Sequence, residues 1–409
     1  MRKLLFALLL AALTLSAQSR PRIRAVTVFI DIDRDNYVQR VTQAQEFLAA
    51  AKTAFNSAGF AGAGGRITTQ PFPEWTRGMS HADAIALVRN LREAASKGRS
   101  ALNIGPAMMN DNDDASNVAL LTDIMAEVSV DANLVMADET GIHWRAIREA
   151  AQLIKALSER SPHGDANFNF AAIAMMKPYG PYYPGSYHVG KGHAFAIAME
   201  GASVVADVFA KYHDPNDAER ELSQAFTRYT QEAETIARSL AEKTGWTYEG
   251  IDATPAPSLQ NSIASAIESF TGAPFGSSGT MTASGIITRA VQSTPVKRTG
   301  YSGLMIPVME DRGLAQRWAE GTFGIDSILA YSAVCAGGVD TVPLPGDVTV
   351  EQIGRILSDV AWLAWKWNKP LGARLMPAPQ KKAGDRTEFS GGAIVNTSVQ
   401  PLPGTRRAP

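Results

Sequence analysis

Cysteine is almost absent from this chain of 409 residues, which contains a single one, Cys335. One cysteine cannot form an internal disulfide. The residue must therefore be a buried thiol, a reactive thiol or an intermolecular link. A buried and inert thiol is the most frequent case, because free cysteine is among the most buried residue types.

The chain also has no excess charge and no long apolar run. Its 39 basic and 40 acidic residues give no global basic character, which argues against nucleic acid as a partner. The apolar stretch Leu4 to Leu15 is too short to span a bilayer comfortably. Because Arg2 and Lys3 precede it and small residues follow, it predicts a signal peptide over residues 1–19, export to the periplasm or medium, and no stable membrane insertion after cleavage. An uncleaved anchor is the alternative.

Short apolar segments alternate with amphipathic ones along the rest of the chain. Residues 23–30 (IRAVTVFI) are typical of a buried strand, and residues 37–57 of a helix with one apolar face. Close to ten such strand–helix units follow one another without a linker or internal repeat. This pattern predicts an α/β fold, with one sheet closed into a barrel over residues 20–398 as a single large domain. A doubly wound sheet fits the length equally well, and the tail 399–409 is predicted to be disordered.

Three stretches before residue 298 could carry chemistry. Residues 110–114 (NDNDD) resemble a calcium loop, but a helix cap fits better because the EF-hand glycine and glutamate are missing. The glycine-rich stretch 178–193 holds His188 and His193, either of which could be a base or a metal ligand, or it could simply be a tight corner. In residues 276–280 (GSSGT), Gly279 and Thr280 could present free amides to an anion, although an ordinary helix cap is as reasonable.

The segment from residue 298 to 389 is the richest in candidate groups, because polar side chains follow its short apolar stretches. Thr349 and Gln352 fit a capping box, which predicts a helix after a strand and leaves Asp347 exposed on the connecting loop. Lys382 and Asp385 follow another predicted strand. They could bind an anionic substrate, or they could belong to a solvated charged loop.

If the strands form a parallel barrel, their carboxyl ends meet on one face. The residues at those ends would then surround one site, although each carboxylate could instead cap its own following helix. The residues predicted to gather there are Asp252, Glu310, Asp311, Asp340, Asp347 and Arg374.

Three segments resemble the signatures of uncharacterised protein family 0210, also called domain of unknown function 711. They are GYSGLMIPVMED (300–311), VCAGGVDTVPLPGDVT (334–349) and NKPLGARLMPAPQKKAGDRTEF (368–389). The resemblance implies a ten-stranded β/α barrel similar to pyruvate formate-lyase and anaerobic ribonucleotide reductase, generally a homodimer, with no established activity. It also implies a family cysteine at Cys335 and a family histidine at His188. The chain departs from the family where His193 and Phe195 replace acidic residues, and it lacks a glycyl-radical segment.

Two functions follow from these patterns. The first is an enzyme acting on a small anionic metabolite, with Cys335 as nucleophile or proton donor and His188 or Asp340 as its partner. The second is an exported protein that binds a ligand or cation without transforming it. The sequence assigns no substrate, cofactor or metal.

Overall fold

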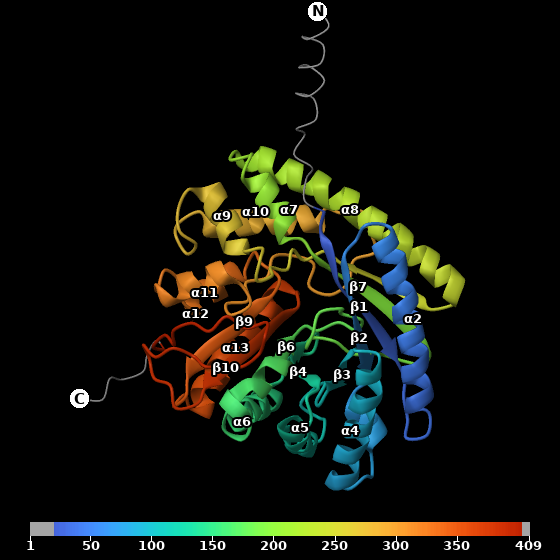
Figure 1. Cartoon of the computed structure of the whole chain (residues 1–409). Coiled ribbons are helices and arrows are strands. Elements are labelled where there is room, and N and C mark those ends of the chain that lie inside the picture. Colours follow the sequence, from blue (N-terminus) through green and yellow to red (C-terminus); the bar gives the residue numbers. More distant parts are fainter. Residues whose placement is uncertain (1–19, 403–409) are drawn as a thin grey trace, which may run out of the picture.

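One large sheet forms the centre of the molecule in the computed structural model, which describes residues 20–402 (Figure 1). The predicted signal peptide lies outside these residues. All ten strands belong to this sheet: β1 (Arg22–Ile30), β2 (Gly62–Thr69), β3 (Ala101–Pro106), β4 (Asp131–Asp138), β5 (Gly141–Ile142), β6 (Phe170–Ala174), β7 (His193–Glu200), β8 (Thr247–Asp252), β9 (Gly338–Pro345) and β10 (Leu371–Ala378).

The strands do not all run in one direction. Their order is β8-β7-β1-β2-β3-β4-β6-β10-β9, with β5 paired to β4. Strands β1, β2, β3, β4 and β6 are mutually parallel, whereas β7 is antiparallel to β1 and β10 is antiparallel to β6. The expectation that all strand ends meet on one face is therefore wrong. Alternating strands and helices imply parallel neighbours locally, but they do not fix how two parallel groups pair with each other.

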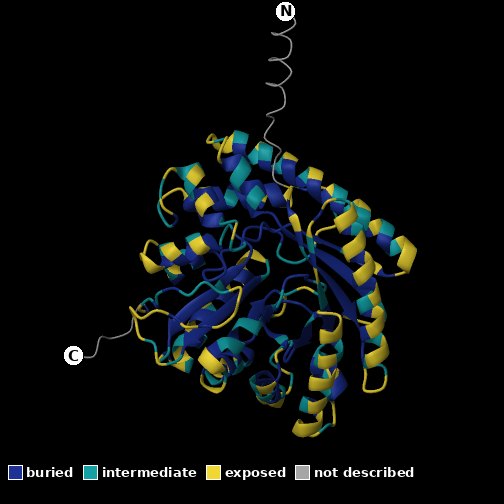
Figure 2. Cartoon of the chain, viewed as in Figure 1, coloured by how far each residue is buried: buried dark blue, intermediate teal, exposed yellow. Residues whose placement is uncertain are grey.

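Helices cover the outside of the curved sheet (Figure 1). Their outward faces are exposed while the strands are buried, as amphipathic helices require (Figure 2). The α-helices are α2 (Tyr37–Ser57), α3 (Phe72–Thr76), α4 (His81–Lys97), α5 (Ser116–Glu127), α6 (Trp144–Arg160), α7 (Ala202–Phe209), α8 (Pro215–Thr244), α9 (Ile263–Thr271), α10 (Thr280–Gln292), α11 (Arg312–Ala319), α12 (Ile325–Tyr331) and α13 (Val350–Trp367), and the 3-10 helix η1 spans Pro162–Asn169. Within residues 20–402, none of these helices combines the length and apolarity needed to cross a bilayer.

Local sequence explains where the best-defined helices begin and end. Asp214 precedes the long helix α8, and its carboxylate accepts hydrogen bonds from the amides of Asn216 and Asp217. The helix ends at Gly245, whose φ of 73° is a conformation that glycine adopts without strain. The predicted capping box of α13 is present, with Thr349 and Gln352 each bonding to the other's backbone amide.

The two edges of the sheet, β8 and β9, are both contacted by residues 297–308. The amide of Ile251 in β8 donates to the carbonyl of Lys297 (2.8 Å), and the amide of Val308 donates to the carbonyl of Asp340 in β9 (3.0 Å). Both contacts are isolated parallel bridges. The apolar residues 304–308 form no regular strand, consistent with Pro307, which cannot donate a ladder hydrogen bond. The regularly paired strands form an open path from β8 to β9.

The loop of residues 177–192 lies against the inner face of the parallel strands. Buried polar side chains from four strands hold it: the hydroxyl of Thr27 donates to the Pro181 carbonyl (2.8 Å), and Asn103 and Asn133 both donate to the Pro184 carbonyl (2.7 Å each). Thr68 bonds to Ser186 (3.0 Å). Inward-facing polar residues thus satisfy a buried loop backbone, as buried carbonyls require.

The chain end packs against the domain. Val399 is 1% exposed, and the Gln400 side chain donates to the carbonyls of Trp318 and Phe323. Residues 399–402 are thus ordered, in contrast to the predicted disordered tail. The remaining residues, 403–409, lie outside the described part of the chain.

Candidate functional site

A cavity of about 280 Å³ lies inside the sheet, next to the 177–192 loop. That volume is at the small end of ligand cavities, which begin at about 300 Å³. The loop contributes Tyr182 and Tyr183 to the cavity wall. On the side of the parallel strands, the wall includes Ala101 and Asp131, the first residues of β3 and β4. Six charged side chains line the cavity: Arg24, Arg66, Asp131, Glu310, Asp340 and Arg374.

Arg374 on β10 is the centre of the most tightly paired group. Its Nε donates to Oδ1 of Asp340 on β9 (2.6 Å), and its Nη2 donates to Oε1 of Glu310. Burial raises the pKa of Asp340, and Arg374 opposes this rise. Burial would also raise the pKa of Glu310, but Arg374 and Arg24 outweigh it and hold that pKa below its usual range. Three of the six residues predicted to gather at one site therefore do so.

Arg24 on β1 extends this group. One of its nitrogens, Nη2, lies 3.3 Å from Oε2 of Glu310, and Nη1 lies 3.4 Å from Oε2 of Glu200. Nη1 also donates to the Pro257 carbonyl (3.2 Å). Glu310 thus bridges two arginines that come from strands on opposite sides of the cavity.

Arg66 on β2 has no such partner. Its Nη1 donates to the Pro181 carbonyl (2.9 Å), and its guanidinium lies 4.8 Å from the centre of the Tyr183 ring. It forms no ion pair with any carboxylate of residues 20–402. Burial, followed by repulsion from Arg24, lowers the pKa of Arg66, as expected for a cation that lacks a counter-ion.

Asp131, the first residue of β4, is the remaining acid on the cavity wall. Burial raises its pKa to about 7, although Arg66 and Arg374 oppose the rise. Asn169 at the end of η1 is hydrogen-bonded to its carboxyl group. Asp131 also forms no ion pair among the described residues. The cavity wall therefore holds one cation, Arg66, and one acid, Asp131, that have no ion-pair partner at contact distance.

Asp252 and Asp311 are buried but have structural partners. Asp252 accepts hydrogen bonds from Thr254 and from the amides of Tyr301 (2.7 Å) and Ser302 (3.0 Å), which fixes the turn that presents Tyr301 to the cavity. Asp311 caps α11 through the Leu314 amide (3.1 Å). Each carboxylate accepts four hydrogen bonds from the protein, and neither residue lines the cavity.

The other predicted ligand-binding residues of the C-terminal segment lie on the surface. Asp347 is exposed on the loop between β9 and α13. Lys382 and Asp385 are exposed in a turn, where the carboxylate of Asp385 accepts from the Lys382 amide (2.8 Å). They do not line the central cavity, and the alternative of a solvated charged loop describes them better.

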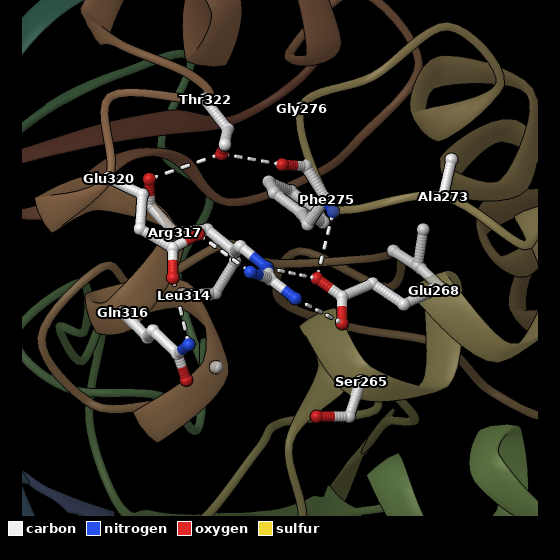
Figure 3. A network of polar contacts seen from close by, with 12 residues as sticks. Ser265, Glu268, Ala273, Phe275, Gly276, Leu314, Gln316, Arg317, Glu320 and Thr322 are labelled. Carbon is white, nitrogen blue, oxygen red and sulfur yellow. Dashed lines mark hydrogen bonds and ion pairs between the residues drawn. The ribbon is translucent and has the colours of Figure 1, made fainter.

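At the predicted anion site, Thr280 is buried whereas Gly279 is exposed. The Thr280 hydroxyl accepts from the Gly276 amide (3.0 Å), and the Thr280 amide donates to the Ser277 carbonyl (3.1 Å). In Figure 3, Arg317 of α11 reaches Glu268 of α9, whose carboxylate also accepts from the Phe275 amide (2.9 Å). The amides of Gly276 and Thr280 are thus used within the fold, and neither Gly279 nor Thr280 lines the central cavity.

Cys335 and His188 have separate surroundings. The thiol of Cys335 is buried beside Ser284 of α10 and Lys369, and burial raises its pKa to about 12. His188 is 2% exposed, and burial lowers its pKa to about 4, although the charges of Asp31 and Glu249 oppose this shift. Cys335 therefore packs against α10. A thiol that stays protonated is a poor nucleophile.

Sequence reasoning missed Arg24, Arg66 and Asp131. Each stands in or at the start of an otherwise apolar strand: Arg24 within RIRAVTVFI, Arg66 within GAGGRITT and Asp131 before ANLVMA. A charged residue on a strand that is covered on both faces must lie in a cavity or form a buried pair. That signal was present in the sequence.

The family model described as "Uncharacterised ACR (DUF711)" matches residues 15–390. The chain belongs to this family. Similar proteins are named only as UPF0210 proteins. One from Pyrobaculum arsenaticum is 32% identical over 265 residues, covering 62% of this chain and 57% of the relative. One from Methanopyrus kandleri is 32% identical over 272 residues, covering 64% and 60%.

A UPF0210 protein from Listeria innocua is 28% identical over 287 residues, covering 67% of this chain and 63% of the relative. The matched part therefore spans about three fifths of the length of these DUF711 relatives. The relatives' descriptions name no activity.

Proposed function

We propose that the central cavity binds, and acts on, a small molecule that carries one carboxylate. The observation that carries this proposal is Arg66, a cavity-lining arginine whose only hydrogen-bond acceptor among the described residues is one backbone carbonyl. The planar fork of a guanidinium matches a carboxylate with two parallel hydrogen bonds. A ligand carboxylate would form the contact ion pair that no described carboxylate of the protein forms with Arg66.

The charges around Arg66 favour a monoanion. Arg24 and Arg374 are already paired with Glu310 and Asp340, so among the described residues Arg66 is the one cavity-lining arginine without an ion pair at contact distance. A dianion such as phosphate would meet the carboxylates of Glu310 and Asp340 at close range, which is unfavourable in a site with little water. Tyr183 and Tyr301 provide apolar walls for the remaining atoms of the ligand.

Asp131 makes an enzyme the better of the two functional hypotheses. A proton-transferring group works best when its pKa lies near the working pH, and the pKa of Asp131 is about 7. The alternative is an exported protein that binds a ligand or cation without transforming it, and binding of a cation has less support. Within the described residues, no group of three or more histidine, cysteine or acidic side chains is placed to hold a metal ion.

The site can be tested with acetate and lactate as probes. Each should raise the melting temperature of the wild-type protein, and calorimetry should give a weaker affinity for Arg66→Gln by about tenfold or more, because a hydrogen bond to a charged group contributes roughly 1.5–3 kcal/mol. The matched control is Arg148→Gln on the exposed face of α6, which should bind like wild type. Equal affinities in wild type and Arg66→Gln would disprove the site.

The barrel, export and homodimer remain part of the proposal. Support for a barrel is the bridging of both sheet edges by residues 297–308. Export rests on the predicted signal peptide, and fractionation of the source cells tests it. A homodimer rests on the family resemblance, and sedimentation of the purified protein tests it.

A further inference from the structure

We propose that Asp131 takes up a proton when a carboxylate binds at Arg66, so that the cavity accepts its ligand together with one proton. The inference rests on the proposed carboxylate site. Asp131 and Arg66 line the same cavity, and neither forms an ion pair within residues 20–402. At longer range, the positive charge of Arg66 and the negative charge of Asp131 therefore stabilise each other.

The groups that face Asp131 come from four elements. Arg66 lies on β2, Arg92 on α4 and Arg374 on β10, and Tyr183 comes from the inner loop. Two of these arginines are already occupied. Arg374 pairs with Glu310 and Asp340, and Arg92 donates to the carbonyls of Ser129 (2.8 Å) and Ser100 (3.2 Å). Of the three arginines, Arg66 opposes protonation of Asp131 most strongly, and it is the one that lines the cavity without an ion pair to a described carboxylate.

Binding of an anion removes that balance. A carboxylate that pairs with Arg66 neutralises the strongest charge opposing protonation of Asp131, and it places a second negative charge in the same buried space. Both effects favour the protonated acid. Because the pKa of Asp131 is about 7 without ligand, binding at a pH above 7 converts an ionised carboxylate to a neutral carboxyl group. The proton comes from the solvent, and no bond of the ligand is broken.

Isothermal titration calorimetry with lactate measures this proton directly. The titration is carried out in Tris and in HEPES, whose different ionisation enthalpies reveal the number of protons taken up. We expect uptake of roughly one proton per lactate at pH 8, and almost none at pH 5.5, where Asp131 is already protonated. Asp131→Asn should bind lactate at pH 8 without proton uptake. Asp347→Asn, on the exposed loop after β9, should behave like wild type.

The outcomes separate this inference from the site itself. Lactate binding at pH 8 without proton uptake would overturn the role of Asp131 and leave the carboxylate site standing. Uptake that persists in Asp131→Asn would also overturn it. Failure of lactate to bind wild type at either pH would instead contradict the proposed site. If Asp131→Asn does not fold, as judged by circular dichroism, the comparison of wild type at the two pH values decides.

Discussion

Burial decides the chemical character of individual residues in this protein more than residue type does. Cys335 is the case where the two conflict most. Its position in a family segment predicts a catalytic thiol, but its sulfur is buried against α10 and burial raises its pKa to about 12. The thiolate fraction at neutral pH is then negligible, so the side chain contributes packing and not nucleophilicity.

Replacing Cys335 with alanine tests this role. We expect Cys335→Ala to lower the free energy of unfolding by about 1 kcal/mol through loss of buried volume, with lactate affinity unchanged. Urea unfolding and calorimetry measure the two quantities. A folded Cys335→Ala protein with greatly weakened lactate binding would show that the thiol takes part in ligand binding.

Arg374, in contrast, is a buried cation that stabilises two buried carboxylates, those of Glu310 and Asp340. In Arg374→Met, the acids Glu310 and Asp340 stay buried without their shared cation, and breaking such a pair costs about 3–5 kcal/mol. The pKa of Glu310, held low in wild type, would rise in the variant. The folded variant then binds more protons than the unfolded chain above the ordinary carboxyl pKa, so its stability falls as pH rises.

Unfolding in urea at pH 5 and pH 8 measures this effect. The difference in stability between wild type and Arg374→Met should be larger at pH 8, and adding Glu310→Gln should recover part of it. A difference that does not change with pH would show that the carboxylates are solvated and that the ion pairs contribute little.

At the scale of helices and strands, caps distinguish structural acids from candidate ligands. Asp311 accepts from the amides of Gly313 and Leu314 at the start of α11, and also from the Ile263 amide at the start of α9. Thr349 caps only α13 and does so at the surface. We expect Thr349→Ala to cost about 1 kcal/mol and Asp311→Ala to cost more than the upper value for one cap, about 2 kcal/mol.

Thermal unfolding of the two variants gives this order directly. Asp311→Asn serves as the matched control, because asparagine is also a good cap, and it should lie between wild type and Asp311→Ala. If Thr349→Ala is the more damaging change, the double cap at Asp311 is not important for stability.

The sequence predicted elements with local signals well and long-range arrangement poorly. The helix over 37–57 and the capping box of α13 were confirmed, because apolar spacing and caps are local. The antiparallel pairing of β7 with β1 and of β10 with β6 was not predicted, because no local sequence pattern determines how one group of parallel strands pairs with another. Asn103 holds the inner loop by donating to the Pro184 carbonyl. Only the pairing of distant elements shows that role.

At the scale of the whole molecule, one exposed aromatic patch deserves a test as the homodimer surface. Trp144 on α6 and Trp362 and Trp365 on α13 are 53%, 50% and 40% exposed, and the Trp362 ring lies 6.5 Å from Trp144 and 5.6 Å from Trp365. Tryptophan is enriched at the centres of protein interfaces. If the homodimer forms through this patch, Trp362→Gln combined with Trp365→Gln should convert it to monomer.

Analytical ultracentrifugation distinguishes the possibilities. The matched control is Val38→Gln, which changes an exposed apolar residue on α2 and should leave the dimer intact. A dimer that survives the double tryptophan change would place the interface elsewhere, and a monomeric wild type would contradict the homodimer itself.

The central claim is that Arg66 holds a ligand carboxylate inside the sheet. A crystal structure of the protein grown with lactate tests it most directly. We predict lactate in the central cavity, with a carboxylate oxygen about 2.7–2.9 Å from a guanidinium nitrogen of Arg66 and the Arg374 pairs with Glu310 and Asp340 unchanged. A structure with only water at Arg66, and lactate elsewhere or absent at a concentration that saturates binding in solution, would contradict the claim.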